Sequence, residues 1–387
     1  LADGVELQSG VLGSLDVPAQ SSVEVQVPVA PFQPEPGVAY VLDLSFTLTE
    51  ATAWADAGHE VAFAQLAMPQ HVASRPLSTG ELEPVKHLDS NAEAKVVGDG
   101  FALLCRRSDG RLSQWTVGDQ PVLLAAPKLS AFRAATDNDR IPGVCAKWRE
   151  VGLERLVETG GPVEVGHSGD GTAYVAYHSR AAAEGVEAGF ELSYRYTVYP
   201  TGDVVLCQQI MPYGELPSLP RLGLELRLDQ AFDNLTWLGR GPIECYPDRK
   251  NAARVGLYQS SVAGQYVDYV MPQEHGHKTD VRWLALTDGA ERGLLIVGQP
   301  MLGFNVSLYD DRTLDEAQHP WELLPCGEVV LHLDAAMCGV GNGSCGPGVL
   351  PAYQVKAEPT VWSIRLRPFN PTNEDPAVLA RQVLPTE

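Results

Sequence analysis

One stretch in the second half of this 387-residue chain decides how the rest is interpreted: Trp237-Leu238-Gly239-Arg240-Gly241-Pro242-Ile243-Glu244-Cys245-Tyr246-Pro247-Asp248-Arg249-Lys250. Two glycines and two prolines predict a loop, because both residue types interrupt helices and strand interiors. The stretch also carries a tryptophan, a tyrosine and five charged side chains. A loop of this composition on a β scaffold is typical of binding sites. A structural corner, in which the aromatic rings fill the edge of a core, is the alternative.

Alternating apolar and polar residues predict strands on both sides of this stretch. The alternation is clearest in three segments: Phe190–Val198, Leu222–Leu228 and Trp362–Leu366. The turn residues Pro200–Asp203 connect the first of these to a further strand and predict a hairpin. One helix is expected at about Ala146–Leu156, and no alternation of strands and helices is present. The sequence therefore predicts an all-β protein whose main domain, residues 87–387, is a large many-stranded antiparallel sandwich.

The first part of the chain predicts a smaller β-sandwich at residues 1–72. The valines of Val23–Val29 and the apolar residues of Tyr40–Leu48 alternate with other residues, as in half-buried strands. Trp54 is expected to fill the space between the two sheets. The front strands of such a sandwich are not evident, so we expect an immunoglobulin-like domain truncated at its N-terminus. Residues 73–86 lack periodicity and are rich in Pro, Ser and Gly, which predicts a linker.

Composition limits the partners and the compartment. The net charge of −21 argues against binding to nucleic acid or to an anionic membrane. No run approaches the roughly 20 apolar residues of a membrane span. The seven cysteines are scattered without zinc-site spacing, which predicts reduced thiols and a cytoplasmic protein. Since the chain begins with Leu1, we expect it to be an excised fragment, and a signal peptide upstream stays compatible with the sequence.

Three short segments carry candidate chemistry, each with a structural alternative. Asp137-Asn138-Asp139 offers oxygens for a cation or for sugar hydroxyls, or it caps the following helix. His275 and His277 form a His-x-His pair, but no further histidine lies nearby to complete a metal site. The glycine-rich segment Gly339–Gly348 lacks the phosphate-loop pattern, and it favours close backbone approach to a ligand or a domain.

These residues together resemble one family. Trp237, Gly239, Gly241 and Pro242, followed by Glu244, Tyr246, Asp248 and Arg249, resemble the signature of the C-terminal domain of glycoside hydrolase family 2 β-galactosidases. Four other segments agree in order and spacing: Ala51–Trp54 with Ala57–His59, Phe132–Ala134 with Thr136–Asp139, Tyr269–Gly276 with Asp280–Trp283, and Cys338–Gly341 through Pro347. The first resembles the immunoglobulin-like domain that precedes this C-terminal domain, so the resemblance covers nearly the whole chain.

The resemblance implies a supersandwich of the galactose mutarotase type, called the β-galactosidase small-chain domain. In the family this domain packs beside a (β/α)₈ barrel, which supplies both catalytic glutamates and a magnesium ion, with sodium as a possible further ion. No barrel pattern is present here, so we expect no catalytic residue and no metal site in this chain. The full bacterial enzyme would hydrolyse terminal β-galactosides with retention and would assemble as a homo-oligomer.

Six residues are the carbohydrate-facing candidates that the resemblance implies: Asp137, Asn138, Asp139, Asn342, Ser344 and Cys345. Two departures from the family affect this set. Cys345 stands where well-studied members have a tryptophan that stacks on the sugar, and a thiol offers no such surface. The segment Arg140–Cys145 is shorter than the mobile loop of long members. The signature residues are expected to hold a loop or a domain contact rather than to touch sugar.

Two other functions stay open at this point. A stand-alone aldose 1-epimerase of the same fold would need a histidine acid and a carboxylate base, and His178, His275 and His277 are available by type. A carbohydrate-binding or assembly module would have no chemistry of its own.

Overall fold

The computed structural model describes residues 1–74, 76–78, 80–168 and 171–385, which form mainly antiparallel β-sheets. Positions 75 and 79 of the expected linker therefore lie outside the described residues. Sheets of two, five and twelve strands account for most of the structure, so the prediction of an all-β fold is confirmed. All seven cysteines are free. Among the described helices, none is long and apolar enough to cross a membrane.

The strands, in chain order, are β1 (Val41–Thr47), β2 (Glu60–Ala67), β3 (Lys86–Asp89), β4 (Glu93–Gly98), β5 (Phe101–Arg106), β6 (Leu112–Val117), β7 (Gln120–Pro121), β8 (Lys128–Ser130), β9 (Val157–His167), β10 (Ala173–Ala182), β11 (Gly189–Val198), β12 (Val204–Tyr213), β13 (Arg221–Asp229), β14 (Asn234–Gly241), β15 (Arg254–Ser261), β16 (Lys278–Thr287), β17 (Gly293–Ser307), β18 (Glu328–Met337) and β19 (Thr360–Phe369). The helices are α1 (Asp137–Arg140), α2 (Val144–Glu150), α3 (Asp311–Glu316) and α4 (Pro376–Ala380), with 3₁₀ turns η1 (Leu153–Arg155), η2 (Ala263–Gln265), η3 (Pro320–Glu322) and η4 (Pro351–Tyr353).

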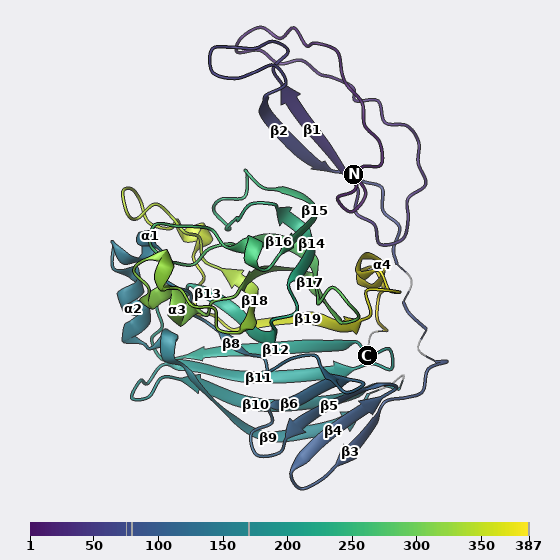
Figure 1. The fold of residues 1–387 in the computed structure, drawn as a ribbon, viewed down its shortest axis with the longest axis vertical. Coiled ribbons are helices and arrows are strands. Elements are labelled where there is room, and N and C mark those ends of the chain that lie inside the picture. The colour runs from purple at the N-terminus through teal and green to yellow at the C-terminus, as the bar shows by residue number, and fades with distance from the viewer. Residues whose placement is uncertain (75, 79, 169–170, 386–387) are drawn as a thin grey trace.

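Strand β17 folds the twelve-stranded sheet back on itself, because its two halves pair with different strands. Gly293–Gln299 pairs with β19, whereas Gly303–Ser307 pairs with β18. From β19 the sheet continues through β12, β11 and β10 to β9, and from β18 it continues to β13 and β8. Figure 1 shows these two branches as separate layers, with β13 and β18 above β12 to β9. Buried apolar side chains from both branches join one core.

The five-stranded sheet, β3 to β7, covers the β9–β10 end of this core (Figure 1). Leu103 and Trp115 from this sheet lie in the same core cluster as Tyr196 and Leu206 of the large sheet. Alternation along β11 explains the arrangement, since every second side chain faces inward. On the far side of the large sheet, α4 covers a smaller apolar cluster through Leu379.

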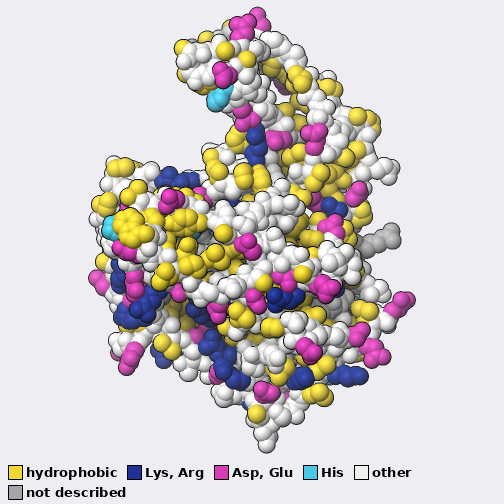
Figure 2. Space-filling view, viewed as in Figure 1, with side chains coloured by type: hydrophobic (Ala, Val, Ile, Leu, Met, Phe, Trp, Pro, Cys, Tyr) yellow, Lys and Arg dark blue, Asp and Glu magenta, His cyan; other side chains and the backbone are white. Residues whose placement is uncertain are grey.

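The N-terminal region departs from the sequence-based expectation. Only β1 and β2 form there, as one antiparallel pair that projects from the body (Figure 1 and Figure 2). Val23–Val29 forms no strand, so that prediction was wrong, because these valines find no partner strand and remain largely exposed. Trp54 is 68% exposed and fills no core. The pair is fixed to the body by Gln65, whose side chain exchanges hydrogen bonds of 2.9 and 2.7 Å with the Val255 backbone.

Two further elements correct the sequence analysis. Trp237–Gly241 is not a loop but the end of β14, which lies between β15 and β16. Its glycines are needed for packing inside the sheet, since a Cβ on Gly239 would lie 2.7 Å from Val281 Cγ2. The expected helix at 146–156 is shorter and begins earlier. Gly152, at a φ of +68°, separates α2 from η1, because a left-handed residue ends a helix.

Candidate functional site

Three segments far apart in the sequence meet at one edge of the body: the start of α1, the loop after β14 and the glycine-rich loop after β18. The first contact is made by Asn138, whose Nδ2 donates to the Gly341 carbonyl at 2.9 Å. Its Oδ1 accepts from both the backbone and the hydroxyl of Ser344, at 3.0 and 2.7 Å. One half-buried amide therefore holds the glycine-rich loop at two points.

The second contact comes from the signature loop. The Asp248 carboxylate accepts from the backbone N–H groups of Val340 and Gly341, at 3.1 and 2.8 Å. Arg249 donates to the Gly341 carbonyl and, at 3.0 Å, to Asn342 Oδ1. A carboxylate that accepts two backbone donors makes stronger bonds than a neutral group would. Charge-assisted hydrogen bonds were expected from these two residues, and their partners lie in the glycine-rich loop.

The third contact is buried and involves Arg133 and Asp139. Thr136 begins α1, and the Asp139 carboxylate accepts from both its backbone and its hydroxyl. Arg133, fully buried, donates to Asp139 and also to the carbonyls of Cys338 and Gly339, at 2.8 and 3.2 Å. Although burial works against its charge, the Asp139 carboxylate raises the pKa of Arg133 above its ordinary value.

The six carbohydrate-facing candidates thus lie together but differ in exposure. Asp137, Asn342 and Cys345 are exposed, Asn138 and Ser344 are half-buried, and Asp139 is buried. The side chain of Asp139 faces Arg133, whereas that of Asp137 is 62% exposed and lies 3.9 Å from Arg140. Three exposed side chains of this group can therefore reach a ligand, while the buried and half-buried ones hold the loops.

The remaining signature residues differ in burial: Trp237, Gly239, Gly241 and Tyr246 are buried, Glu244 is half-buried and Pro242 is exposed. Glu244 accepts hydrogen bonds from the Gly276 backbone, at 2.7 Å, and from the Tyr269 hydroxyl. Burial, reinforced by Glu244, raises the pKa of Tyr269. Tyr246 is buried, and its ring stacks on His277 with centroids 5.3 Å apart. The peptide bond before Pro242 is cis.

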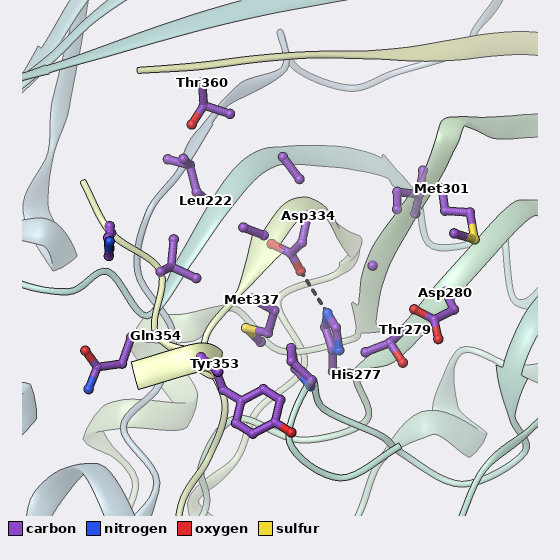
Figure 3. A pocket seen from close by; sticks show the side chains of 18 of the residues that line it. Leu222, His277, Thr279, Asp280, Met301, Asp334, Met337, Tyr353, Gln354 and Thr360 are labelled. Atoms are coloured by element: carbon purple, nitrogen blue, oxygen red, sulfur yellow. Dashed lines mark ion pairs between the residues drawn. The ribbon is translucent and has the colours of Figure 1, made fainter. Parts of the chain in front are cut away.

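A buried ionic network behind this edge was missed by the sequence analysis. Arg221 donates to both oxygens of Asp334, at 3.0 and 2.8 Å, and lies 3.4 Å from Glu274. His277 Nε2 lies 3.2 Å from Asp334 Oδ2, the ion pair drawn in Figure 3. Burial opposes the charge of Asp334, yet Arg221 and His277 hold its pKa well below the ordinary value. All four residues are at most 3% exposed.

One signal in the sequence could have indicated this network. Asp334 interrupts the apolar run of β18, which is buried on both faces. A charge inside such a strand requires a partner, because an unpaired buried charge is costly. The partner is Arg221 at the start of β13, on the strand that pairs with β18 and two residues before Gly223, which lies opposite Asp334.

The described residues hold no group of three or more His, Cys, Asp or Glu side chains that could bind a metal ion. His275 and His277 do not act as a pair: His275 Nδ1 lies 2.9 Å from the Gln273 carbonyl, and His277 Nδ1 lies 3.0 Å from the Cys245 carbonyl.

Comparison with known families gives two matches in series. Residues 97–366 match the family described as "Beta galactosidase small chain", and residues 1–69 match "Beta-galactosidase, domain 4".

Individual relatives agree with these matches. The chain is 32% identical to a β-galactosidase of Priestia megaterium over 83% of its length and 31% identical to one of Vibrio vulnificus over 95%. It is also 30% identical to a β-galactosidase of Kluyveromyces lactis over 86% of its length. The matched segments are 30%, 36% and 33% of those proteins, so the chain spans about a third of the length of the curated relatives.

Among solved structures, a putative aldose 1-epimerase of Escherichia coli K12 is similar to 73% of this chain and 98% of its own, with 10% identity and a TM-score of 0.38. A galactose 1-epimerase of Lactobacillus acidophilus gives 9% identity and a TM-score of 0.37, over 75% of this chain and 99% of its own. Likeness at this level carries no inference about activity.

Proposed function

Because this chain belongs to the β-galactosidase family, through the small-chain domain that fills most of its length, we propose that it is the non-catalytic C-terminal part of an enzyme that hydrolyses terminal β-galactosides. The observation that carries the proposal is the order of the two matched domains along one chain. The chain matches relatives over nearly all of its own length but over about a third of theirs. The catalytic barrel would belong to the remaining two thirds.

In this proposal the three joined loops form part of the wall of the sugar site. Asn342 and Asp137 are exposed and supply a carbonyl oxygen, an amide and a carboxylate for sugar hydroxyls. Arg249 already donates to Asn342 Oδ1, which orients that amide before any ligand arrives. Cys345 would border the sugar without a stacking surface. The ordered position of these side chains supports a positioning role, since pre-oriented polar groups lose less entropy on binding.

The burial of the ionic network argues against a separate catalytic activity in this chain. An epimerase needs an accessible histidine and carboxylate beside the sugar. His277, Asp334 and Glu274 are at most 3% exposed and face one another or Arg221. Two other histidines were named as candidates. His275 is 2% exposed, and His178 is exposed on β10, where its Nδ1 lies 2.7 Å from the Ser193 hydroxyl. These placements favour the non-catalytic reading over the epimerase.

The proposed partners are the enzyme's own barrel domain, a β-galactoside and further copies of the enzyme. The metal that the resemblance implies would lie with the barrel domain. The loops of this chain would then act only through hydrogen bonds and shape.

The purified chain provides the test. Nitrophenyl β-galactoside hydrolysis and galactose mutarotation should both stay at the uncatalysed rate. Mutarotation above that rate, lost in His178→Ala but kept in His87→Ala, would favour an epimerase instead. Hydrolysis by the chain alone would overturn the proposal.

A further inference from the structure

A second feature of the large domain is a cavity of about 650 Å³ between β18 and β19, which the signature loop borders through Pro247 and Lys250. Its origin is the change of partner along β17. Because the first half of β17 pairs with β19 and the second half with β18, the two strands diverge from the region around Met301. Asp334 lies on one side of the resulting fork and Thr360 on the other, as Figure 3 shows.

The floor of this cavity carries no free charge. Asp334 and His277 line it, but both are almost completely buried and belong to the ion-paired network with Arg221. Met337 and Leu222 add apolar surface around them (Figure 3). A charged ligand would therefore find no unpaired opposite charge at the floor.

The rim is polar and balanced in charge. Lys250 lies 2.6 Å from Asp280 Oδ1, and Lys356 lies 3.6 Å from Glu358. Arg240 fixes the other oxygen of Asp280 at 2.6 Å, so this carboxylate is held in place at the rim. Asp280 also has a φ of +54°, a backbone conformation that few non-glycine residues adopt and that recurs at functional sites.

Neutral hydrogen-bonding groups complete the lining. Tyr353 offers a ring and a hydroxyl, and it is 38% exposed. Gln354 and Thr360 add acceptor oxygens, because the amide N–H of Gln354 and the hydroxyl of Thr360 already donate to backbone carbonyls, at 3.0 Å each. The lining thus combines donors and acceptors in pairs, one aromatic ring and no excess charge.

We propose that this cavity binds a neutral polyhydroxylated ligand, of the size of one or two sugar rings, at a site that none of the six carbohydrate-facing candidates lines. Ion pairs at the rim suit hydroxyl groups, since the carboxylate accepts and the ammonium donates to neighbouring oxygens. The Tyr353 ring suits the apolar face of a sugar. The volume lies within the range of small-molecule pockets, roughly 300 to 1,000 Å³. This inference goes beyond the proposed function and does not depend on it.

The experiment is a ligand-detected NMR titration of the full chain with lactose and with lactobionate, its anionic analogue. We expect saturable binding of lactose and at least tenfold weaker binding of lactobionate. Thr360→Trp fills the cavity from β19 and should weaken lactose binding at least tenfold. Gln354→Trp, outside any strand, should do the same. Ser113→Trp, on the five-stranded sheet, is the matched control and should bind as the parent does.

Two results would overturn the proposal. One is the absence of saturable lactose binding. The other is lactose binding that is unchanged in both cavity-filling variants or that is lost in Asn342→Ala instead. Either outcome would assign the bound sugar to the loop-built wall. In that second case the proposed function would stand and only this inference would fail.

Discussion

The contact between Asp248 and the glycine-rich loop gives the sharpest test of how the three loops are held. Its carboxylate accepts from the backbone N–H groups of Val340 and Gly341, at 3.1 and 2.8 Å. Asp248→Ala leaves both donors without their partner. Hydrogen bonds to a charged group contribute about 1.5–3 kcal/mol each, so we expect a loss of roughly 3 kcal/mol in stability.

The assay is thermal denaturation followed by circular dichroism. A loss of roughly 3 kcal/mol corresponds to a fall in Tm of at least about 5 °C for a chain of this size. Asp248→Asn keeps one acceptor and should fall about half as far. Asp137→Ala is the matched control, because its carboxylate is 62% exposed, and it should change stability by less than about 0.5 kcal/mol. A parent-like Tm for Asp248→Ala would refute the reasoning.

Three further outcomes are expected. Burial lowers the pKa of Lys278 from 10.5 to about 8, so the unfolded chain keeps this proton to a higher pH than the folded chain does. The unfolding free energy of the parent should therefore rise between pH 8 and 10.5, by up to roughly 3 kcal/mol relative to Lys278→Met. Parallel pH profiles for the two proteins would contradict this. Arg221→Met leaves buried carboxylates unpaired and should lower the unfolding free energy, measured by urea denaturation, by about 3–5 kcal/mol. Arg312→Met removes an exposed ion pair and should lower it by less than about 0.5 kcal/mol. Equal losses in the two variants would count against the buried network. Trp54→Ala should leave the Tm unchanged, because the Trp54 ring is exposed. Trp115→Ala should lower the unfolding free energy by about 3–5 kcal/mol, because Trp115 is buried in the core. A lower Tm for Trp54→Ala would show that Trp54 is a core residue after all.

The sequence predicted the main domain well where apolar and polar residues alternate. Alternation places β11, β13 and β19 within a few residues of their bounds, and the turn at Pro200–Asp203 connects β11 to β12 as expected. Apolar residues alternate with polar ones along these strands, so their period of two is visible in the residues themselves, even though β13 is buried on both faces. The same rule fails at Val23–Val29, because alternation needs a partner sheet to become a strand.

The signature stretch shows the other limit. Gly239 and Gly241 suggested a loop, but they lie in β14, where larger side chains would collide with Val281, Trp237 and Tyr258. The sequence alone does not distinguish a glycine that is required for close packing from one that is required for a turn, because the difference depends on which side chains lie beside it in the fold. The sequence named the candidate residues as a set but did not indicate which of them are exposed and which are buried. That division depends on Arg133, which donates to carbonyls of the glycine-rich loop and which no local sequence pattern connects to that loop.

The central claim is that this chain completes a β-galactosidase without catalysing the reaction itself. The direct measurement is hydrolysis of nitrophenyl β-galactoside by the Priestia megaterium β-galactosidase lacking its matching C-terminal segment, with and without this chain co-expressed. We predict negligible hydrolysis by either piece alone and hydrolysis restored when both are present. A complex that forms but stays inactive, or hydrolysis by this chain alone, would contradict the claim.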